Sequence, residues 1–306
     1  MVRPTETMAP GKAVGELAAG CIWTLAGLWW MGKVLSRFYR KGPDSFRASS
    51  FYCIRGKRIP FEPVAKFVIG IIYFFGEYSA GLDEKGEFVN REHATFMAFS
   101  LAVVFSGMVD LATFFQLGVP KDFSYVTTFF IPFSGWYIYR ANGRVQGHGH
   151  MHMDVEQGSE PVFDAITQKE TTSLQMGHLI TLSYLLLGVT VLLESWERGR
   201  TSVVLSLLRP MASIQLGVAY MLSSFLVYNP CCRWEAELHG DRALPLLQSI
   251  WCVLFPASAT FVIAVYAAVT WARKQYKGED FPHDRLKSQE EKMALLQSDS
   301  SEEPCF

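Results

Sequence analysis

The stretch HATFMAFSLAVVFSGMVDLATFFQ, residues 93–116, decides the class of this fold. As an α-helix it would span about 36 Å, more than the roughly 30 Å hydrocarbon core of a bilayer. Asp110 is its one acidic or basic residue apart from His93 at the start. Such a segment predicts a helix that crosses a membrane.

Six further apolar segments lie on either side of this one, each about long enough to cross a bilayer. The composition agrees, because half of the 306 residues are hydrophobic and 19% are charged, against about 25% charged residues in soluble domains. We therefore expect an all-α integral membrane protein with seven transmembrane helices. The predicted spans are residues 13–32, 64–80, 93–116, 123–139, 177–193, 202–228 and 246–272.

Lys and Arg collect on the cytoplasmic side of membrane proteins, so the connecting segments predict the orientation. With the N-terminus outside, the cytoplasmic segments carry 17 Lys and Arg and the outer segments carry 9. This favours an N-out, C-in arrangement. The predicted organisation is a short N-terminal segment 1–12, a membrane domain 13–272 and a disordered cytoplasmic tail 273–306. Within the membrane domain we expect a basic loop at 33–63 and a histidine-rich loop at 140–176.

Three stretches carry a resemblance to a known family: REHATFMAFSLAVVFSGMVDLATFF, HLITLSYLLLGVTVLLES and EEKMALLQSDSSEE. The chain resembles the transmembrane protein 45 family, multi-pass animal proteins that share a domain of unknown function. The family pattern of a His followed by Gly-x-x-Asp is matched by His93, Gly107 and Asp110, and its Glu and Arg positions by Glu194 and Arg209. The resemblance implies seven helices in membranes of the secretory or endosomal system. It implies no established reaction.

Histidines are concentrated in the tract GHGHMHMD, where His148, His150 and His152 occupy every second position. Neutral imidazoles suit Zn or Cu, and the neighbouring methionines would add soft ligands for Cu(I). A pH-responsive loop and an ordinary polar loop are the alternatives.

A second group of ionisable residues is predicted near the outer ends of the spans. It comprises Glu16, Glu77, Glu92, His93 and His178. At similar depth, carboxylates and imidazoles can share a proton or bind a divalent ion. Side chains at helix ends can also reach the interface without any site.

Asp110 and Arg209 are charged residues predicted to lie inside spans. Both fall in the cytoplasmic half of the membrane, where an ion pair would reduce the cost of burying them. A structural pair between the two residues is the favoured hypothesis, and a transport or proton path is the alternative. Asp110 lies about 25 Å along its helix from His93, so these two residues are not expected to share a site.

The predicted cytoplasmic tail contains EKMALL, which fits an acidic dileucine sorting motif made of Glu291, Leu295 and Leu296. This pattern predicts a trafficking adaptor as partner. Ser300 precedes an acidic residue by three positions and is a candidate phosphorylation site that would add negative charge.

Three hypotheses for function follow from these residues. The favoured one is a non-enzymatic binding or trafficking protein of secretory, endosomal or plasma membranes, with the lipid bilayer as its environment. The second is an ion or small-solute channel or transporter that uses Asp110 and Arg209. The third is a metal-dependent membrane hydrolase that uses His93 and His178. No nucleic-acid partner is expected, since the near-neutral charge gives no basic footprint.

Overall fold

The described part of the chain is helical, with seven long helices and one short one. The structure, a computed structural model, describes residues 10–42, 45–54, 59–83, 85–89, 91–120, 122–149, 160–228 and 243–277. Its helices are α1 (Pro10–Lys41), α2 (Phe61–Ala80), α3 (Arg91–Phe114), α4 (Phe123–Gly149), α5 (Glu160–Ser195), α6 (Glu197–Thr201), α7 (Val203–Tyr228) and α8 (Ala243–Lys277).

Each of the seven predicted spans coincides with one long helix, which confirms the all-α fold class. Five helical segments are long and apolar enough to cross a membrane: Ala13–Lys41, His93–Phe114, Gln175–Ser195, Val203–Phe225 and Cys252–Ala272. The helices α2 and α4 do not reach that hydropathy. In α2 the physical reason is its charged residues, Glu62, Lys66 and Glu77.

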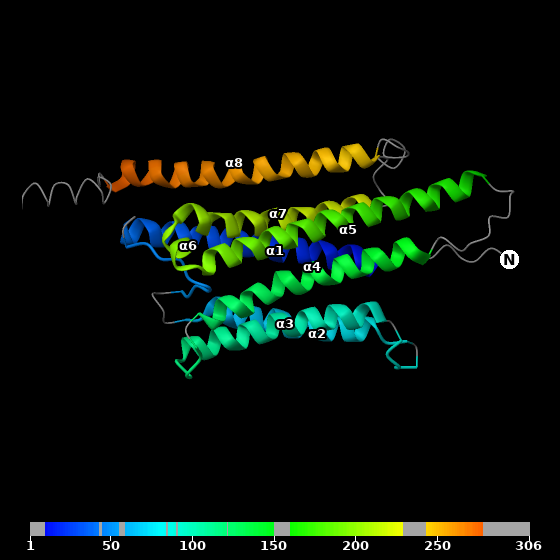
Figure 1. Cartoon of the computed structure of the whole chain (residues 1–306), viewed down its shortest axis with the longest axis horizontal. Helices are drawn as coiled ribbons and strands as arrows, with labels where there is room; N and C mark the ends of the chain where they lie inside the picture. Colours follow the sequence, from blue (N-terminus) through cyan, green and yellow to red (C-terminus); the bar gives the residue numbers. More distant parts are fainter. Residues whose placement is uncertain are drawn as a thin grey trace, which may run out of the picture.

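The helices lie side by side in an elongated bundle (Figure 1). Packing is closest between α1 and α7 and between α2 and α3, and further contacts join α3 to α4, α4 to α5 and α5 to α7. The helix α8 lies along one edge of the bundle, and α2 and α3 lie along the opposite edge. The start of α1 and the end of α8 lie at opposite ends.

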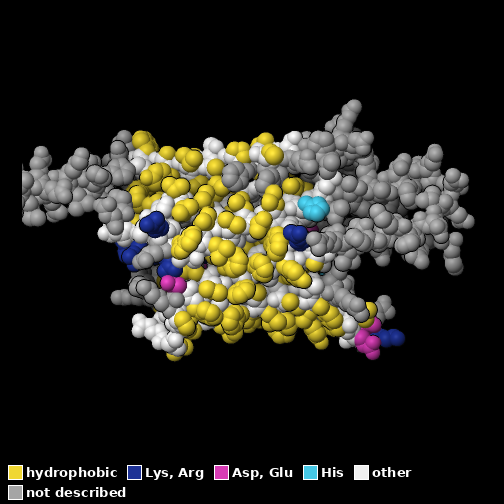
Figure 2. Space-filling view, in the orientation of Figure 1, with side chains coloured by type: hydrophobic (Ala, Val, Ile, Leu, Met, Phe, Trp, Pro, Cys, Tyr) yellow, Lys and Arg dark blue, Asp and Glu magenta, His cyan; other side chains and the backbone are white. Residues whose placement is uncertain are grey.

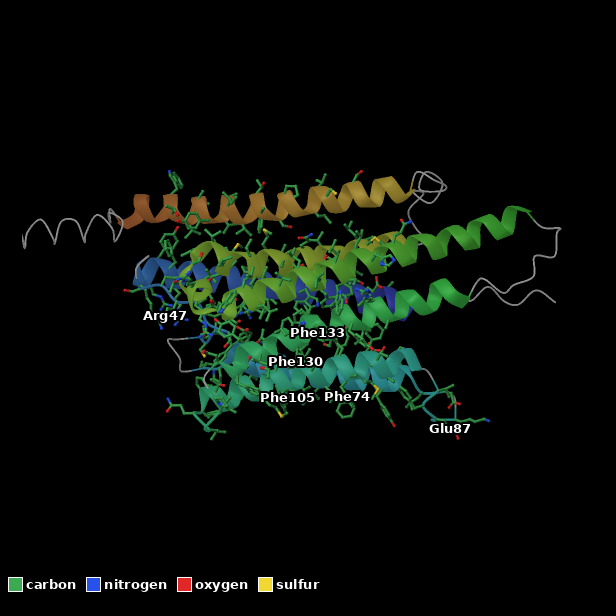
Figure 3. All side chains as sticks on the ribbon, in the orientation of Figure 1. Arg47, Phe74, Glu87, Phe105, Phe130 and Phe133 are labelled. Atoms are coloured by element: carbon green, nitrogen blue, oxygen red, sulfur yellow. The ribbon has the colours of Figure 1, made fainter. Side chains whose placement is uncertain are left out.

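The surface pattern is that of a protein surrounded by lipid. Hydrophobic side chains cover the middle of the face in Figure 2, and charged side chains lie toward its two ends. The labelled aromatic residues Phe105, Phe130 and Phe133 in Figure 3 belong to this band, and their side chains are 43–49% exposed. Arg47 and Glu87 lie at opposite ends of the molecule in the same view.

Several helices extend beyond the predicted spans. The segment 140–176 was expected to be a loop, yet α4 continues to Gly149 and α5 begins at Glu160. The helix α1 likewise continues to Lys41, inside the predicted basic loop. Residues such as Arg, Lys, Glu and Gln are good helix formers, so helices continue past the end of the apolar stretch. Conversely, α3 ends at Phe114, because Gln116 adopts a left-handed backbone conformation with φ of 57°.

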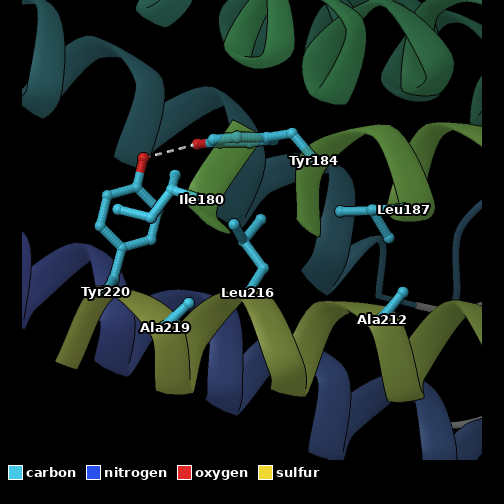
Figure 4. Close-up of a cluster of buried hydrophobic side chains, with 7 residues drawn as sticks. All are labelled: Ile180, Tyr184, Leu187, Ala212, Leu216, Ala219 and Tyr220. Atoms are coloured by element: carbon cyan, nitrogen blue, oxygen red, sulfur yellow. Dashed lines mark hydrogen bonds between the residues drawn. The ribbon is translucent and has the colours of Figure 1, made fainter. Parts of the chain in front are cut away.

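One of the buried hydrophobic clusters lies between α5 and α7. Figure 4 shows Ile180, Tyr184 and Leu187 of α5 facing Leu216 and Tyr220 of α7. The two tyrosine hydroxyls are 2.9 Å apart and hydrogen bonded. This bond gives each of the two buried hydroxyls a polar partner among apolar side chains.

Glycine allows α1 and α7 to approach closely. A Cβ atom added at Gly217 of α7 would lie 2.3 Å from Thr24 Oγ1 and 2.7 Å from the Gly20 carbonyl oxygen of α1. Small residues at such crossings let helix backbones pack together in a membrane.

Gly217→Ala should therefore lower the stability of the protein by about 1–3 kcal/mol, because the added methyl group must push the two helices apart. The matched control is Gly32→Ala, since a Cβ there meets nothing within 4 Å. Thermal unfolding of both variants in detergent is the measurement. Equal melting temperatures for the two variants would contradict this account of the α1–α7 contact.

Candidate functional site

A large, partly open cavity lies between the helices. Its volume is 1310 Å³, and its walls come from α1, α2, α3, α4, α5 and α7. The middle of the wall is apolar and aromatic and includes Trp23, Phe99 and Tyr184. Small-molecule sites in proteins are typically about 300–1,000 Å³ and have predominantly hydrophobic and aromatic walls. The cavity is therefore large enough for a small molecule, and its apolar and aromatic wall is typical of a binding site.

The cavity opens to the surroundings between α1 and α2. Leu25 of α1 and Phe61 of α2 line the cavity, and their side chains are also 65% and 48% exposed. The two helices are bridged near both ends. Trp29 and Phe61 have ring centroids 5.2 Å apart, and the Tyr73 hydroxyl donates to the Gly15 carbonyl oxygen over 3.3 Å.

One end of the cavity contains buried charges. This is the basic-loop end, where residues 42–60 connect α1 to α2. Lys66 of α2 lines the cavity and donates to Asp110 Oδ2 of α3 over 2.7 Å, and its Nζ atom lies 3.4 Å from Glu62 Oε1. Ser124 of α4 donates to the other oxygen of Asp110. Asp110 is 0% exposed, so its charge is balanced entirely within the protein.

Arg209 of α7 continues this arrangement and is 1% exposed. Its guanidinium lies 3.5 Å from Glu194 of α5 and 3.8 Å from Glu62. It also donates to the Ser50 carbonyl oxygen over 2.9 Å and lies 4.1 Å from the ring centroid of Trp30. Glu62, Lys66, Asp110, Glu194 and Arg209 form what we call the charge network.

Glu62 is the central residue of the charge network. Besides Lys66 and Arg209, it accepts hydrogen bonds from the Trp30 indole at 2.9 Å and the Tyr52 backbone N–H at 2.8 Å. The connection between α1 and α2 therefore folds back onto the bundle, with Phe46, Ala48 and Tyr52 buried. Burial raises the pKa of the Tyr52 hydroxyl well above its ordinary value, so it stays neutral beside the network.

The predicted pair between Asp110 and Arg209 is wrong. Asp110 is paired with Lys66, and Arg209 lies beside Glu194 and Glu62. The two residues nevertheless belong to one network, since Glu62 contacts the cation of each pair. Depth alone does not say which neighbour a side chain faces.

The opposite end, where α2 connects to α3, is the histidine end of the cavity. His93 Nδ1 lies 2.6 Å from Glu77 Oε2, so the structure brings together two residues of the predicted outer group. Glu16 of α1 lines the same cavity. His178 is exposed on α5 and is not among the lining residues. The side chain of Glu92 lies outside the described part.

The metal hypothesis stays a prediction for most of its residues. His148 falls in the last turn of α4, while its side chain and all of His150 and His152 lie outside the described residues. Among the side chains that the structure does describe, no three His, Cys, Asp or Glu residues are grouped to hold a metal ion. The sorting residues Glu291, Leu295 and Leu296, with Ser300, also lie outside the described ranges.

Two charged residues of the network, Glu62 and Lys66, were not singled out from the sequence. Glu62 falls just before the predicted second span and was assigned to the basic loop. Lys66 carried a usable signal, because a Lys within an apolar segment at membrane depth indicates a buried partner or a water-filled space. Thr128 of α4, which also lines the cavity, carried no such signal.

A scan against protein-family models finds no match, and a search of curated proteins finds no significant match.

The Lys66–Asp110 pair gives a test of the charge network. Lys66→Met should lower the free energy of unfolding by about 3–5 kcal/mol, because it leaves the fully buried Asp110 carboxylate without its cation. Combining it with Asp110→Asn in one chain should restore most of the lost stability. Unfolding of the single and double variants in detergent measures both effects.

The matched control is Lys85→Met, which removes an exposed lysine from the connection between α2 and α3. If Lys66→Met proved as stable as Lys85→Met, the buried ion pair would not be contributing to the fold.

Proposed function

We propose that this chain is a multi-pass membrane protein that binds an apolar or amphipathic small molecule between its helices. The observation that carries the proposal is the cavity of 1310 Å³ with an apolar and aromatic middle and polar ends. Its exposed lining residues Leu25 and Phe61 support entry from the membrane between α1 and α2. Binding is favoured over catalysis because the charged residues at the basic-loop end are engaged with one another.

We also propose seven spans with the N-terminus outside. The helix α2 packs along α3, and α4 packs along both α3 and α5. This packing supports counting α2 and α4 as membrane spans. The Lys and Arg distribution supports the orientation. The motifs at 91–115, 178–195 and 290–303 support membership of the transmembrane protein 45 family. That membership, with the dileucine motif, supports a location in secretory, endosomal or plasma membranes and contact with a trafficking adaptor.

Photolabelling with a long-chain alcohol that carries a diazirine and an alkyne tests the binding proposal. Ile69→Trp should reduce labelling of the purified protein in lipid nanodiscs by about tenfold, because Ile69 lines the cavity and the larger ring fills it. Labelled peptides of the unaltered protein should come from α1, α2 and α4. Fluorescent tagging through the alkyne, followed by peptide mass spectrometry, measures both.

Ile72→Trp is the matched control, since Ile72 is on the same helix, is 65% exposed and does not line the cavity. Equal labelling of both variants would show that the probe binds the outer surface rather than the cavity, and the proposal would fail.

A second candidate function, an ion transporter, is supported by one observation. The cavity is lined by Glu62 and Lys66, which contact Arg209 and Asp110 respectively. A route from the cavity to the buried charges is what the transporter hypothesis requires.

Proton flux into vesicles tests the transporter hypothesis. Vesicles containing the protein and a pH-sensitive dye should acidify several times faster than protein-free vesicles after an external acid step. Glu62→Gln should slow the change, while Glu87→Gln, at an exposed position, should not. Equal rates with and without the protein would exclude proton transport under these conditions.

A further inference from the structure

The basic-loop end of the cavity contains hydrogen-bonding groups with no partner in the protein. The Thr128 hydroxyl is buried without a hydrogen bond, its residue is 4% exposed, and it lines the cavity. The indole N–H of Trp29 is buried, also without a partner, and Trp29 lines the cavity as well. Buried polar groups in native proteins are almost always hydrogen bonded, so such groups indicate a missing partner.

Both groups lie beside the charge network. Thr128 is one helical turn after Ser124, which donates to Asp110. Trp29 precedes Trp30, whose indole donates to Glu62. The ring of Trp29 contacts Phe61 at the start of α2, one residue before Glu62. The two groups without partners therefore border the same end of the cavity from α4 and from α1.

Lys66 lies at this end as well. An ammonium group has three N–H donors, and the hydrogen bond to Asp110 and the ion pair with Glu62 engage at most two of them. The Lys66 side chain is 11% exposed and lines the cavity. The wall at this end of the cavity therefore offers a ligand a hydroxyl, an indole N–H and an ammonium group.

The charges around Lys66 limit which ligand can supply that oxygen. Lys66 already faces the two carboxylates of Asp110 and Glu62. An anionic head group would add a fourth negative charge to a network in which three carboxylates already face two cations, in a region from which water is largely excluded. A cationic head group would lie beside the Lys66 ammonium, and the Glu62 oxygens at this end are already engaged by Trp30, Tyr52 and Lys66. An uncharged head with hydroxyl or carbonyl oxygens satisfies the donors without either penalty.

The adjoining wall is suited to a hydrocarbon tail. From Lys66 to Tyr73, seven residues along α2, the cavity extends for about 10 Å. Ile69 and Gly70 line it from α2 over this length, Trp23 from α1 and Ile131 from α4. A tail placed here would leave the polar head at Lys66.

We propose that this end of the cavity binds the hydroxyl or ester oxygen of an uncharged single-chain lipid, such as a long-chain alcohol or a monoacylglycerol. The inference rests on the proposed function, since it assigns the head group of the ligand that the cavity takes. Thr128, Trp29 and Lys66 donate to the head, and the apolar wall between Lys66 and Tyr73 holds the tail.

Three photoactivatable probes with one shared tail test the head-group assignment. They carry a primary alcohol, a carboxylate or a primary amine, and each is applied to the full chain in nanodiscs. The alcohol probe should reach half-maximal labelling at a concentration several times lower than the carboxylate probe or the amine probe. Thr128→Val should weaken the apparent affinity for the alcohol about threefold to tenfold, as expected for one lost hydrogen bond.

Thr127→Val is the matched control, because Thr127 is equally buried but donates to the Ser124 carbonyl oxygen and does not line the cavity. Thr128→Ser keeps the hydroxyl and should retain the affinity. Thermal unfolding of each variant verifies that it is folded.

The outcomes separate the two proposals. If Ile69→Trp abolishes labelling but the three heads bind alike, or Thr128→Val and Thr127→Val behave alike, the cavity binds a ligand and the head-group assignment is overturned. If Ile69→Trp changes the labelling by none of the probes, the cavity is not a binding site and the proposed function itself fails. Preference for the alcohol that depends on the Thr128 hydroxyl supports both.

Discussion

The burial of Arg209 between Glu194 and Glu62 is the constraint on which the rest of this structure depends. A guanidinium that is 1% exposed within an apolar helix bundle requires compensating charge and hydrogen bonds. Two carboxylates and the Ser50 carbonyl oxygen supply them from α5, from α2 and from the connection before α2. Lys66 and Asp110 extend the network to α3. Charge balance at one end thus determines how the four helices α2, α3, α5 and α7 are placed relative to one another.

The same arrangement accounts for the cavity. The helix α1 packs tightly on α7 through glycine contacts, and α2 packs on α3, where Gly70 allows close approach to Val104. The two pairs are joined at the basic-loop end by the hydrogen bond from Trp30 to Glu62 and at the histidine end by that from Tyr73 to Gly15. Between these joints, the side chains of α1 and α2 leave space. A cavity open between α1 and α2 is the geometric result of two tight pairs held together at their ends.

The sequence was sufficient to predict the helices and insufficient to predict their partners. Long apolar runs such as 93–116 determine where helices form, because a bilayer-length apolar stretch has few other stable conformations. Helix ends were predicted less well, since α4 and α5 extend into polar sequence that also favours helix. Asp110 and Arg209 were recognised as charged positions inside the membrane from their place in apolar runs, whereas Glu194 was singled out only through the family resemblance. Their pairing was not predictable, because it depends on which way each helix faces, and the rotation of α2 toward α3 brings Lys66 rather than Arg209 to Asp110.

The hydrogen bond from Arg209 to Ser50 has a consequence for how the chain is made. The two residues are 159 positions apart, so a ribosome working at about 5–20 residues per second delivers them roughly 8 to 30 seconds apart. During that interval Glu62 and the backbone carbonyl of Ser50 are already synthesised while their cation is not. The first two helices must therefore reach the membrane with this end unfinished, and the arrival of α7 completes it. The first connection of this chain is thus locked late, only after α7 has been made.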